Sequence, residues 1–297
     1  MVSLNNKAVI PTKFELDSEF RFRCYPGISC FTRCCRNIEV LLTPYDVIRM
    51  KKRLGLSSTE LLARYTRYRE DEKTTHPLAF LKMKEEGEKL CPFVDEKEGC
   101  RIYEDRPTAC RYYPVGQATH RVAGEKPDEA VHQEFYVIVK EDHCRGFDEK
   151  KRWTIAEWRE DQAAAGADEL TIEWKNIMMK QNLPRDDKDR ERRQKMFYMA
   201  SYDLDAFRRY VLESRFLEVF DVSPGRLEKI KADEIELMHF AFDYLKYMLG
   251  ISQEISLKPQ VAEERRRFAE QDRAREDAER AARIESIEES AASETAD

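Results

Sequence analysis

The sequence predicts an α+β protein in which a small, loop-rich cysteine-cluster domain precedes a mainly α-helical region and a charged C-terminal tail. Three observations support this fold class. All eight cysteines lie in the first half of the chain, capped amphipathic helical patterns dominate the second half, and the end of the chain is almost entirely Glu, Arg, Ala, Asp and Ser. We expect an N-terminal segment over 1–15, the cysteine-cluster domain over 16–150, the helical region over 151–258 and the tail over 259–297.

The composition limits the classes of partner. The chain has 297 residues, enough for one large domain or two small ones, and 52 Lys+Arg against 58 Asp+Glu give a net charge of −6. This charge gives no reason to expect nucleic acid or an anionic membrane as a partner. Residues 1–17 lack the features of a secretory signal, and no run approaches the roughly 18 apolar residues of a membrane helix. We therefore expect a cytoplasmic protein whose protein partner, if any, the sequence does not identify.

Local signals indicate short elements in the cysteine-cluster domain. Apolar residues alternate over 38–42, as on one face of a strand. Thr43-Pro44 predicts the start of a helix and Gly55 its end, and a capping box at 57–60 starts a second helix. Strands are expected over 78–83 and 135–139. The segment between them has little periodicity, and such a segment needs a covalent or metal link to hold it.

Helical patterns follow from Trp153 onward. A capping box at 154–157 starts one helix, for which Gly166 predicts the end. Further helices are expected over 170–183, 195–202, 204–216 and 223–249, the last ending at Gly250. Their recurring aromatic residues are typical of a packed core. The tail has too few apolar residues for a packed face, so we expect a solvated single helix that grades into disorder.

The cysteines form two groups in the sequence, followed by a single residue. The first group has the pattern C-x5-C-x3-C-C, the second has C-x8-C-x9-C, and no cysteine follows the last one. The candidate ligands are Cys24, Cys30, Cys34, Cys35, Cys91, Cys100, Cys110 and Cys144. Six of them have an arginine neighbour, which favours the thiolate form and allows hydrogen bonds to metal-bound sulfur. The six arginines are Arg23, Arg33, Arg36, Arg101, Arg111 and Arg145.

Three uses of these thiols compete, and metal binding explains most of them. Disulfides fit the even number of cysteines but not a reducing cytoplasm or the adjacent Cys34–Cys35 pair. A catalytic or redox thiol explains one or two positions. For metal binding, zinc and an iron–sulfur cluster remain close, with the cluster slightly favoured because its ligands tolerate more varied spacing than the paired C-x2-4-C loops of zinc sites. Eight ligands would suit two four-coordinate sites.

The sequence resembles a known family at these residues. The stretches that carry the likeness are FRFRCYPGISCFTRCCRNIEVLLTPYDVIRMKKRLG, CPFVDEKEGCRIYEDRPTACRYYPVG and HCRGF, within residues 20–150. They resemble the YkgJ-type cysteine-cluster family, named for a CxxCxxCC motif and described as a zinc- or iron-chelating domain. The resemblance implies metal chelation but supplies no reaction. A flagellin lysine methylase is similar too, which adds methyl transfer as an alternative. The first cysteine run departs from the spacing in the family's name.

The other candidate side chains have ordinary structural explanations. His143 is a possible ligand if one cysteine is spared, and His239 is expected in or at the edge of the core. The remaining histidines follow no metal-binding pattern, and no nucleotide-binding loop is present. Three tyrosines are expected to form a packing shell around the ligands, and the turn at Arg106-Pro107 is expected to aim its guanidinium at the site. These tyrosines are Tyr103, Tyr112 and Tyr113.

Three hypotheses for the function follow. The first is a cytoplasmic metal-binding protein that holds an iron–sulfur cluster or zinc. The second is an enzyme that uses this centre for redox chemistry or protein methyl transfer. The third is a scaffold whose zinc is purely structural. The sequence alone does not decide whether the protein is an enzyme.

Overall fold

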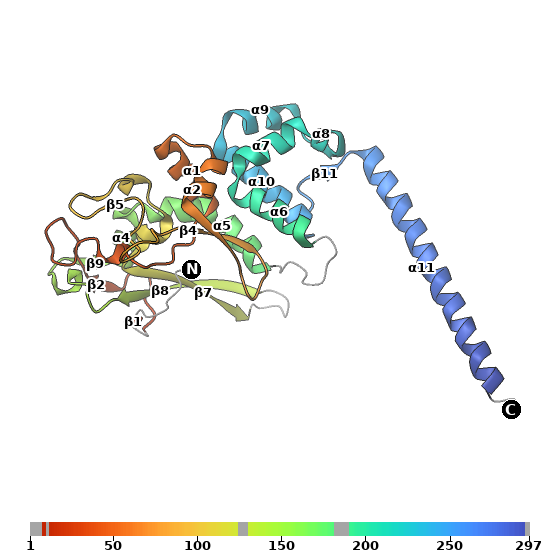
Figure 1. The fold of residues 1–297 in the computed structure, drawn as a ribbon, viewed down its shortest axis with the longest axis horizontal. Coiled ribbons are helices and arrows are strands. Elements are labelled where there is room, and N and C mark those ends of the chain that lie inside the picture. The colour runs from red at the N-terminus through yellow and green to blue at the C-terminus, as the bar shows by residue number, and fades with distance from the viewer. Residues whose placement is uncertain (1–7, 10–11, 124–129, 181–189, 295–297) are drawn as a thin grey trace.

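The computed structural model describes residues 8–9, 12–123, 130–180 and 190–294. Its architecture is α+β, as predicted, with small antiparallel strand pairs followed by a helical C-terminal region. In Figure 1 most strands lie in one part of the molecule, the helices α6–α10 cluster in another with β11 beside them, and α11 extends away from both.

The largest sheet has the antiparallel order β1-β8-β7. The register pairs Val115 with Ile138, and Gly116 lies against Val137 where a Cβ would come within 2.9 Å of the valine side chain. The strand predicted at 135–139 is therefore confirmed, and it extends in both directions. Its partner β7 was not predicted from the sequence. The strands are β1 (Ala8–Val9), β7 (Val115–Ala123) and β8 (Ala130–Lys140).

Four two-stranded antiparallel pairs complete the strand structure. The pair β2–β9 joins the start of the cysteine region to its end, and β3–β4 contains the predicted strand at 78–83, shortened to end at Leu81. Residues 38–42 are extended and bond to β4 through Leu81 N to Val40 O, but form only an isolated bridge. The pairs are β2 (Glu19–Arg21) with β9 (Arg152–Thr154), β3 (Thr66–Glu70) with β4 (Pro77–Leu81), β5 (Val94–Asp95) with β6 (Gly99–Cys100), and β10 (Phe220–Asp221) with β11 (Ser256–Leu257).

The caps of the first helices agree with the prediction. Helix α1 (Pro44–Leu54) begins with Thr43 in a capping box and ends at Gly55, whose φ of 64° is the left-handed conformation that glycine tolerates. Helix α2 (Ser58–Tyr65) begins with the expected box from Ser57 to Glu60. The shorter helical turns of this region are η1 (Arg33–Cys35), η2 (Tyr103–Asp105), α3 (Thr108–Tyr112) and η3 (Gly146–Asp148).

In the helical region, several predicted boundaries are wrong. The helix expected from 170 begins at Ala164, the one expected from 195 begins at Arg190, and the one expected over 204–216 ends at Glu213, before a separate short helix. The helix α4 ends at Asp161, and Gly166 lies instead in the first turn of α5, because Ala163 takes the left-handed conformation that ends the preceding turn. The segment 223–249 is two helices, because Asp233 caps α10 by accepting bonds from two backbone N–H groups. The helices are α4 (Ile155–Asp161), α5 (Ala164–Lys180), α6 (Arg190–Tyr202), α7 (Leu204–Glu213), α8 (Phe216–Val219), α9 (Pro224–Ala232) and α10 (Glu234–Met248).

Two hydrophobic cores lie within the described chain. The larger core combines α1, α2 and the region around Phe93 with the helical region, where the predicted aromatic packing is confirmed. The smaller core is built around Phe22, Tyr136 and Trp158 and joins β2, β8 and α4. Each of the two cores also contains cysteines. The larger core includes residues from both sides of residue 150, so this core does not by itself place a domain boundary there. The domain boundaries predicted from the sequence remain a prediction.

The tail forms α11 (Pro259–Glu294), with Phe268 60 % exposed. The predicted solvated helix is thus confirmed over the described residues, and Figure 1 shows it projecting alone. Among the helices of the described chain, none is both long enough and apolar enough to cross a membrane.

Candidate metal centre

The eight cysteines come from separate, mostly irregular segments. The first two lie in the loop after β2, the adjacent pair in η1, the next three around β5, β6 and α3, and the last one before η3. None forms a disulfide, and two are buried while five are partly buried. They are Cys24, Cys30, Cys34, Cys35, Cys91, Cys100, Cys110 and Cys144.

Pairing of β2 with β9 places the first residues of the cysteine region beside its last residues. The backbone bonds continue past the strands, from Phe22 N to Lys151 O at 3.0 Å and from Arg23 N to Gly146 O at 3.0 Å. A Cβ on Gly146 would come within 2.5 Å of the Phe22 ring, so glycine allows this close approach. The loops that carry Cys24 and Cys144 are consequently neighbours.

A hydrogen bond ties Cys30 to the same place. The backbone N–H of Arg145 donates to the Cys30 sulfur over 3.2 Å. A backbone donor of this kind stabilises a thiolate and is a common feature of metal-bound sulfur. Cys30 therefore joins Cys24 and Cys144 at one location.

The second block of cysteines lies against the adjacent pair. Cys91 N donates to the carbonyl of Cys35 over 2.9 Å, and Asn37 N donates to Lys89 O over 3.0 Å. The Phe31 ring covers Gly99, where a Cβ would come within 2.9 Å of it, so the first run packs over the β5–β6 hairpin that carries Cys100. This packing brings the second block next to Cys35.

Electrostatic coupling describes two overlapping groups of thiols: besides the effect of burial, Cys34 contributes to the raised pKa of Cys24 and Cys144 and also to that of Cys100 and Cys110. Burial raises the pKa of Cys24 to about 12, with Cys34, Cys30 and Cys144 adding to the shift. Burial likewise raises the pKa of Cys91 to about 11, and Cys100 contributes to that rise. For Cys110, burial holds the pKa far above its usual range, and Cys91 and Cys100 are the next causes. Mutual effects of this kind require proximity, so each group is a local cluster.

The adjacent pair connects these groups. The sulfurs of Cys34 and Cys35 lie 3.9 Å apart, and this contact is the main reason that the pKa of Cys34 is raised. Glu141 also raises the pKa of Cys34, and it lies beside Tyr113 and Cys144 in the first group. Cys34 is thus coupled to both groups, and the carbonyl of Cys35 accepts a hydrogen bond from Cys91 of the second group.

The spacing of the sulfurs bears on the kind of metal. Among the eight cysteines, all of which are described, no three sulfurs lie within 4.8 Å of one another. Four thiolates on one zinc ion, at about 2.3 Å from it, would be roughly 3.8 Å apart. An iron–sulfur cluster places its own iron and sulfide atoms between the protein sulfurs and fits a wider ring. The donor set and its spacing are compatible with such a cluster.

The comparisons identify the cysteine region. Residues 23–144 match the CxxCxxCC family. The family is described as "Putative zinc- or iron-chelating domain", which agrees with the expectation of an iron–sulfur cluster or zinc. The matched residues span both cysteine blocks and end at Cys144. No curated protein and no solved structure matches the chain.

The side chains of the six arginines next to cysteines contact groups other than sulfur, unlike the expected hydrogen bonds to the cysteines. Arg111 donates to the carbonyls of Arg106 and Gln162, at 3.1 and 3.0 Å, and Arg101 donates to Pro92 O over 2.8 Å. The other four contact a ring or a carboxylate: Arg23 on Tyr25, Arg33 on Glu88, Arg36 on Glu88 and Glu96, and Arg145 on Asp148. Their charge still acts at a distance, since Arg101 and Arg106 oppose the rise in the pKa of Cys100 that burial causes.

The tyrosines and the Arg106-Pro107 step differ from the sequence prediction. Tyr112 is buried and Tyr113 partly buried, as a packing shell requires, but Tyr103 is 52 % exposed. It stacks on Arg106, whose guanidinium donates to Gln162 Oε1 over 2.6 Å rather than pointing at sulfur. Pro107 leads directly into α3. These residues therefore hold α3 in place.

Tyr113 has a contact that sequence reasoning missed. Its hydroxyl donates to Glu141 over 2.8 Å, and its bond with Cys144 opposes the rise in the pKa of that thiol that burial causes. Glu141 had no motif around it, and only its position three residues before Cys144 offered a signal. This acid links Tyr113, His143 and the first thiol group, because His143 Nε2 lies 3.6 Å from it.

The remaining histidines contribute no described ligand. His76 is buried and stacks on Phe197, with ring centroids 4.5 Å apart. His239, expected in or near the core, is exposed on α10. The side chains of His120 and His132 lie outside the described residues.

A carboxylate cluster elsewhere is occupied by a lysine. Among described residues, Glu173, Asp243 and Glu254 have ligand atoms within 4.8 Å of one another. The ammonium of Lys246 contacts all three, at 2.7, 2.9 and 2.8 Å. Because Lys246 contacts all three carboxylates and Arg226 also pairs with Asp243, the cluster is a salt-bridge network of the helical region.

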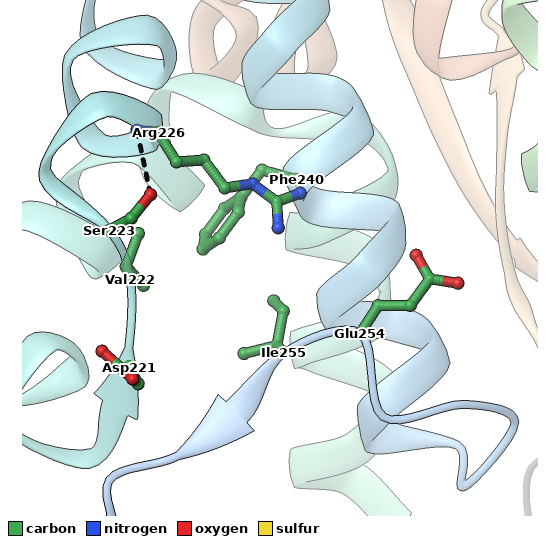
Figure 2. A pocket seen from close by; sticks show the side chains of 7 residues that line it. All are labelled: Asp221, Val222, Ser223, Arg226, Phe240, Glu254 and Ile255. Carbon is green, nitrogen blue, oxygen red and sulfur yellow. Dashed lines mark hydrogen bonds between the residues drawn. The ribbon is translucent and has the colours of Figure 1, made fainter.

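Beside that network lies a small pocket of about 240 Å³ between α9, α10, β10 and β11. Figure 2 shows Arg226 and Phe240 facing it, with Arg226 N donating to Ser223 Oγ. The guanidinium lies 4.8 Å from the centre of the Phe240 ring and pairs with Asp243. No cysteine lines this pocket, so it is separate from the thiol groups.

Proposed function

We propose that this chain is a cytoplasmic metal-binding protein whose cysteines hold two four-thiolate centres, each an iron–sulfur cluster. The first centre uses Cys24, Cys30, Cys34 and Cys144. The second uses Cys35, Cys91, Cys100 and Cys110. The observation that carries the proposal is the gathering of eight free thiols from distant segments into two electrostatically coupled groups, joined by one adjacent pair.

The physical chemistry of these thiols supports a cation at each centre. The pKa is raised, mainly by burial, for thiols in both groups, such as Cys24, Cys91 and Cys110, so their thiolates are unfavourable in this partly buried region without compensating charge. Metal supplies that charge, and binding releases the protons. An iron–sulfur cluster is preferred to single zinc ions because its ligands tolerate the varied sequence spacing C-x5-C-x3-C-C and C-x8-C-x9-C. A bound cluster would supply electron transfer or Lewis acidity.

Anaerobic purification followed by metal and sulfide analysis tests the proposal. We expect a brown protein with iron and acid-labile sulfide in equal amounts. Zinc in place of iron would instead support the scaffold with a purely structural metal. A preparation without either metal, in which all eight thiols can be alkylated, would overturn metal binding altogether.

The division into two centres has its own test. Cys24→Ser and Cys91→Ser each remove one ligand from a different proposed centre. Each single variant is expected to lose about half of the metal and the double variant nearly all of it. The unfolding midpoint of each variant checks that the fold persists. If either single variant loses all the metal while remaining folded, the eight cysteines serve one shared centre and the division is wrong.

A further inference from the structure

A second cavity, of about 450 Å³, opens next to the cysteine groups. Its lining includes Arg33, Arg36, Asn37, Glu88, Lys89 and His143. Arg33 and Arg36 flank the Cys34–Cys35 pair, and His143 immediately precedes Cys144. The wall of the cavity is therefore made by neighbours of three proposed ligands.

The charge of this wall is opposite to that of the whole protein. Three permanently charged basic side chains face one carboxylate there, whereas the chain as a whole carries −6. A concave site with an excess of one charge concentrates the opposite charge. This cavity consequently favours an anionic ligand.

The single carboxylate in the wall indicates which anion the cations accept. Glu88 bonds to Arg36 and lies 3.9 Å from Arg33, so one carboxylate group already lies between the two guanidinium groups. Its side chain is 60 % exposed, and an exposed pair of this kind contributes little to stability. A carboxylate from a ligand can therefore replace it at small cost.

Arg36 is held ready for such an exchange. It also bonds to Glu96, which fixes the guanidinium independently of Glu88. Its Nε is buried and has no hydrogen-bond partner among the described residues. Guanidinium N–H groups are strong donors to carboxylates, and displacement of Glu88 frees the Nη1 donors of Arg36 for a ligand oxygen.

We propose that this cavity binds small molecules through a carboxylate group, with Glu88 as the internal group that the ligand displaces. Arg33 and Arg36 are the binding residues, and Lys89 adds positive charge. The inference that the bound molecule lies beside a metal centre rests on the proposed function. If the cavity binds a carboxylate and the first centre holds metal, the cavity presents a carboxylate-bearing substrate to that centre. This arrangement favours the hypothesis of an enzyme over that of a scaffold with a purely structural metal.

Calorimetric titration of the full chain with glutarate, which resembles the glutamate side chain, tests this site. Inorganic phosphate at matched ionic strength is the comparison. We expect glutarate to bind about tenfold more tightly to Glu88→Gln than to the wild type, because the competing carboxylate is gone. Adding Arg36→Gln to that variant is expected to weaken binding at least about tenfold.

Arg145→Gln in the same background is the matched control. Arg145 also follows a proposed ligand and does not line the cavity, and its side chain is more exposed than that of Arg36, at 60 % against 21 %. Equal losses in the Arg36 and Arg145 variants, no binding to Glu88→Gln, or phosphate binding as tight as glutarate binding would each overturn the carboxylate site. Metal is measured on the same samples. Glutarate binding without metal would refute the proposed function alone, and metal without glutarate binding would refute the cavity alone.

Discussion

Gly146→Ala tests whether the meeting of two chain segments assembles the first thiol group. The added Cβ would lie 2.5 Å from the Phe22 ring and 3.0 Å from the carbonyl oxygen of Arg23. Ordinary carbon contacts are about 3.5–4.0 Å, so ring and backbone must both move apart. Overpacking of this kind costs about 1–3 kcal/mol, and weakening the bond from Arg23 N to Gly146 O adds about 1 kcal/mol.

The expected result is a loss of about 2–4 kcal/mol in the free energy of unfolding, together with metal loss limited to one centre. The shift separates the loop of Cys24 from that of Cys144 but leaves the β5–β6 hairpin untouched. Urea unfolding followed by circular dichroism measures the first effect, and iron per chain measures the second.

Gly166→Ala is the matched control, because this glycine is helical and a Cβ added to it would meet no atom within 4 Å. That change is expected to stabilise the protein by up to about 1 kcal/mol with full metal content. If Gly146→Ala behaves like Gly166→Ala in both measurements, the packing at Gly146 does not assemble the first group.

Three further outcomes follow from particular side chains. The pKa values of Cys24 and Cys91 are raised from 9.0 to about 12 and about 11, so the folded metal-free protein holds these protons longer than the unfolded chain. Its stabilisation by these groups is complete below pH 9 and is lost as the pH rises through 11 and 12. The melting temperature of chelator-treated protein should therefore fall across this range, and a flat profile would contradict the assignment. Lys246→Met removes the cation shared by Glu173, Asp243 and Glu254 and leaves only Asp243 paired, with Arg226. The expected cost in urea unfolding is about 2 kcal/mol, a value kept low because Glu254 is half exposed. About 1 mM Ca²⁺ should leave the wild-type midpoint unchanged, whereas a rise would indicate a metal site at that cluster. Asp46→Ala removes the acceptor for Thr43 N and Thr108 N, which are 2.9 and 2.8 Å from its oxygens, at an expected cost of about 2–4 kcal/mol. Since Asp46 ties α1 to the helix that carries Cys110, metal content should fall as well; full stability would refute this role.

The local elements were predictable where short-range hydrogen bonds decide them. Thr43, Ser57 and Thr154 each begin a helix through a capping box within four residues, and the sequence contains everything those boxes need. The prediction that Gly166 ends a helix was wrong because glycine is also tolerated inside a helix. The break at Asp233 was missed because the apolar pattern continues through it.

The cysteines as a set were predictable, whereas their division into groups was not. Clustering and family resemblance both indicated a metal, and the family match supports that. Which thiols meet depends on the pairing of β2 with β9 and on the contact between Cys91 and Cys35, both of which join distant segments. The expected hydrogen bonds from arginine to sulfur were wrong because sequence adjacency does not fix where a long side chain points; Arg111 extends to backbone carbonyls instead. The expected electrostatic effect holds for Arg101, which opposes the rise in the pKa of Cys91 and Cys100 that burial causes.

The placement of the two groups explains why this region needs so many thiols. Cys35, Cys91, Cys100 and Cys110 pack against the larger hydrophobic core, whereas Cys144 belongs to the smaller one. The chain between the cores consists of irregular loops and strands of two or three residues, which bury little apolar surface of their own. Two metal centres joined at Cys34–Cys35 would link the cores through bonds much stronger than loop contacts. The same junction lies at the wall of the basic cavity, so a ligand bound there would contact the segment on which both centres depend.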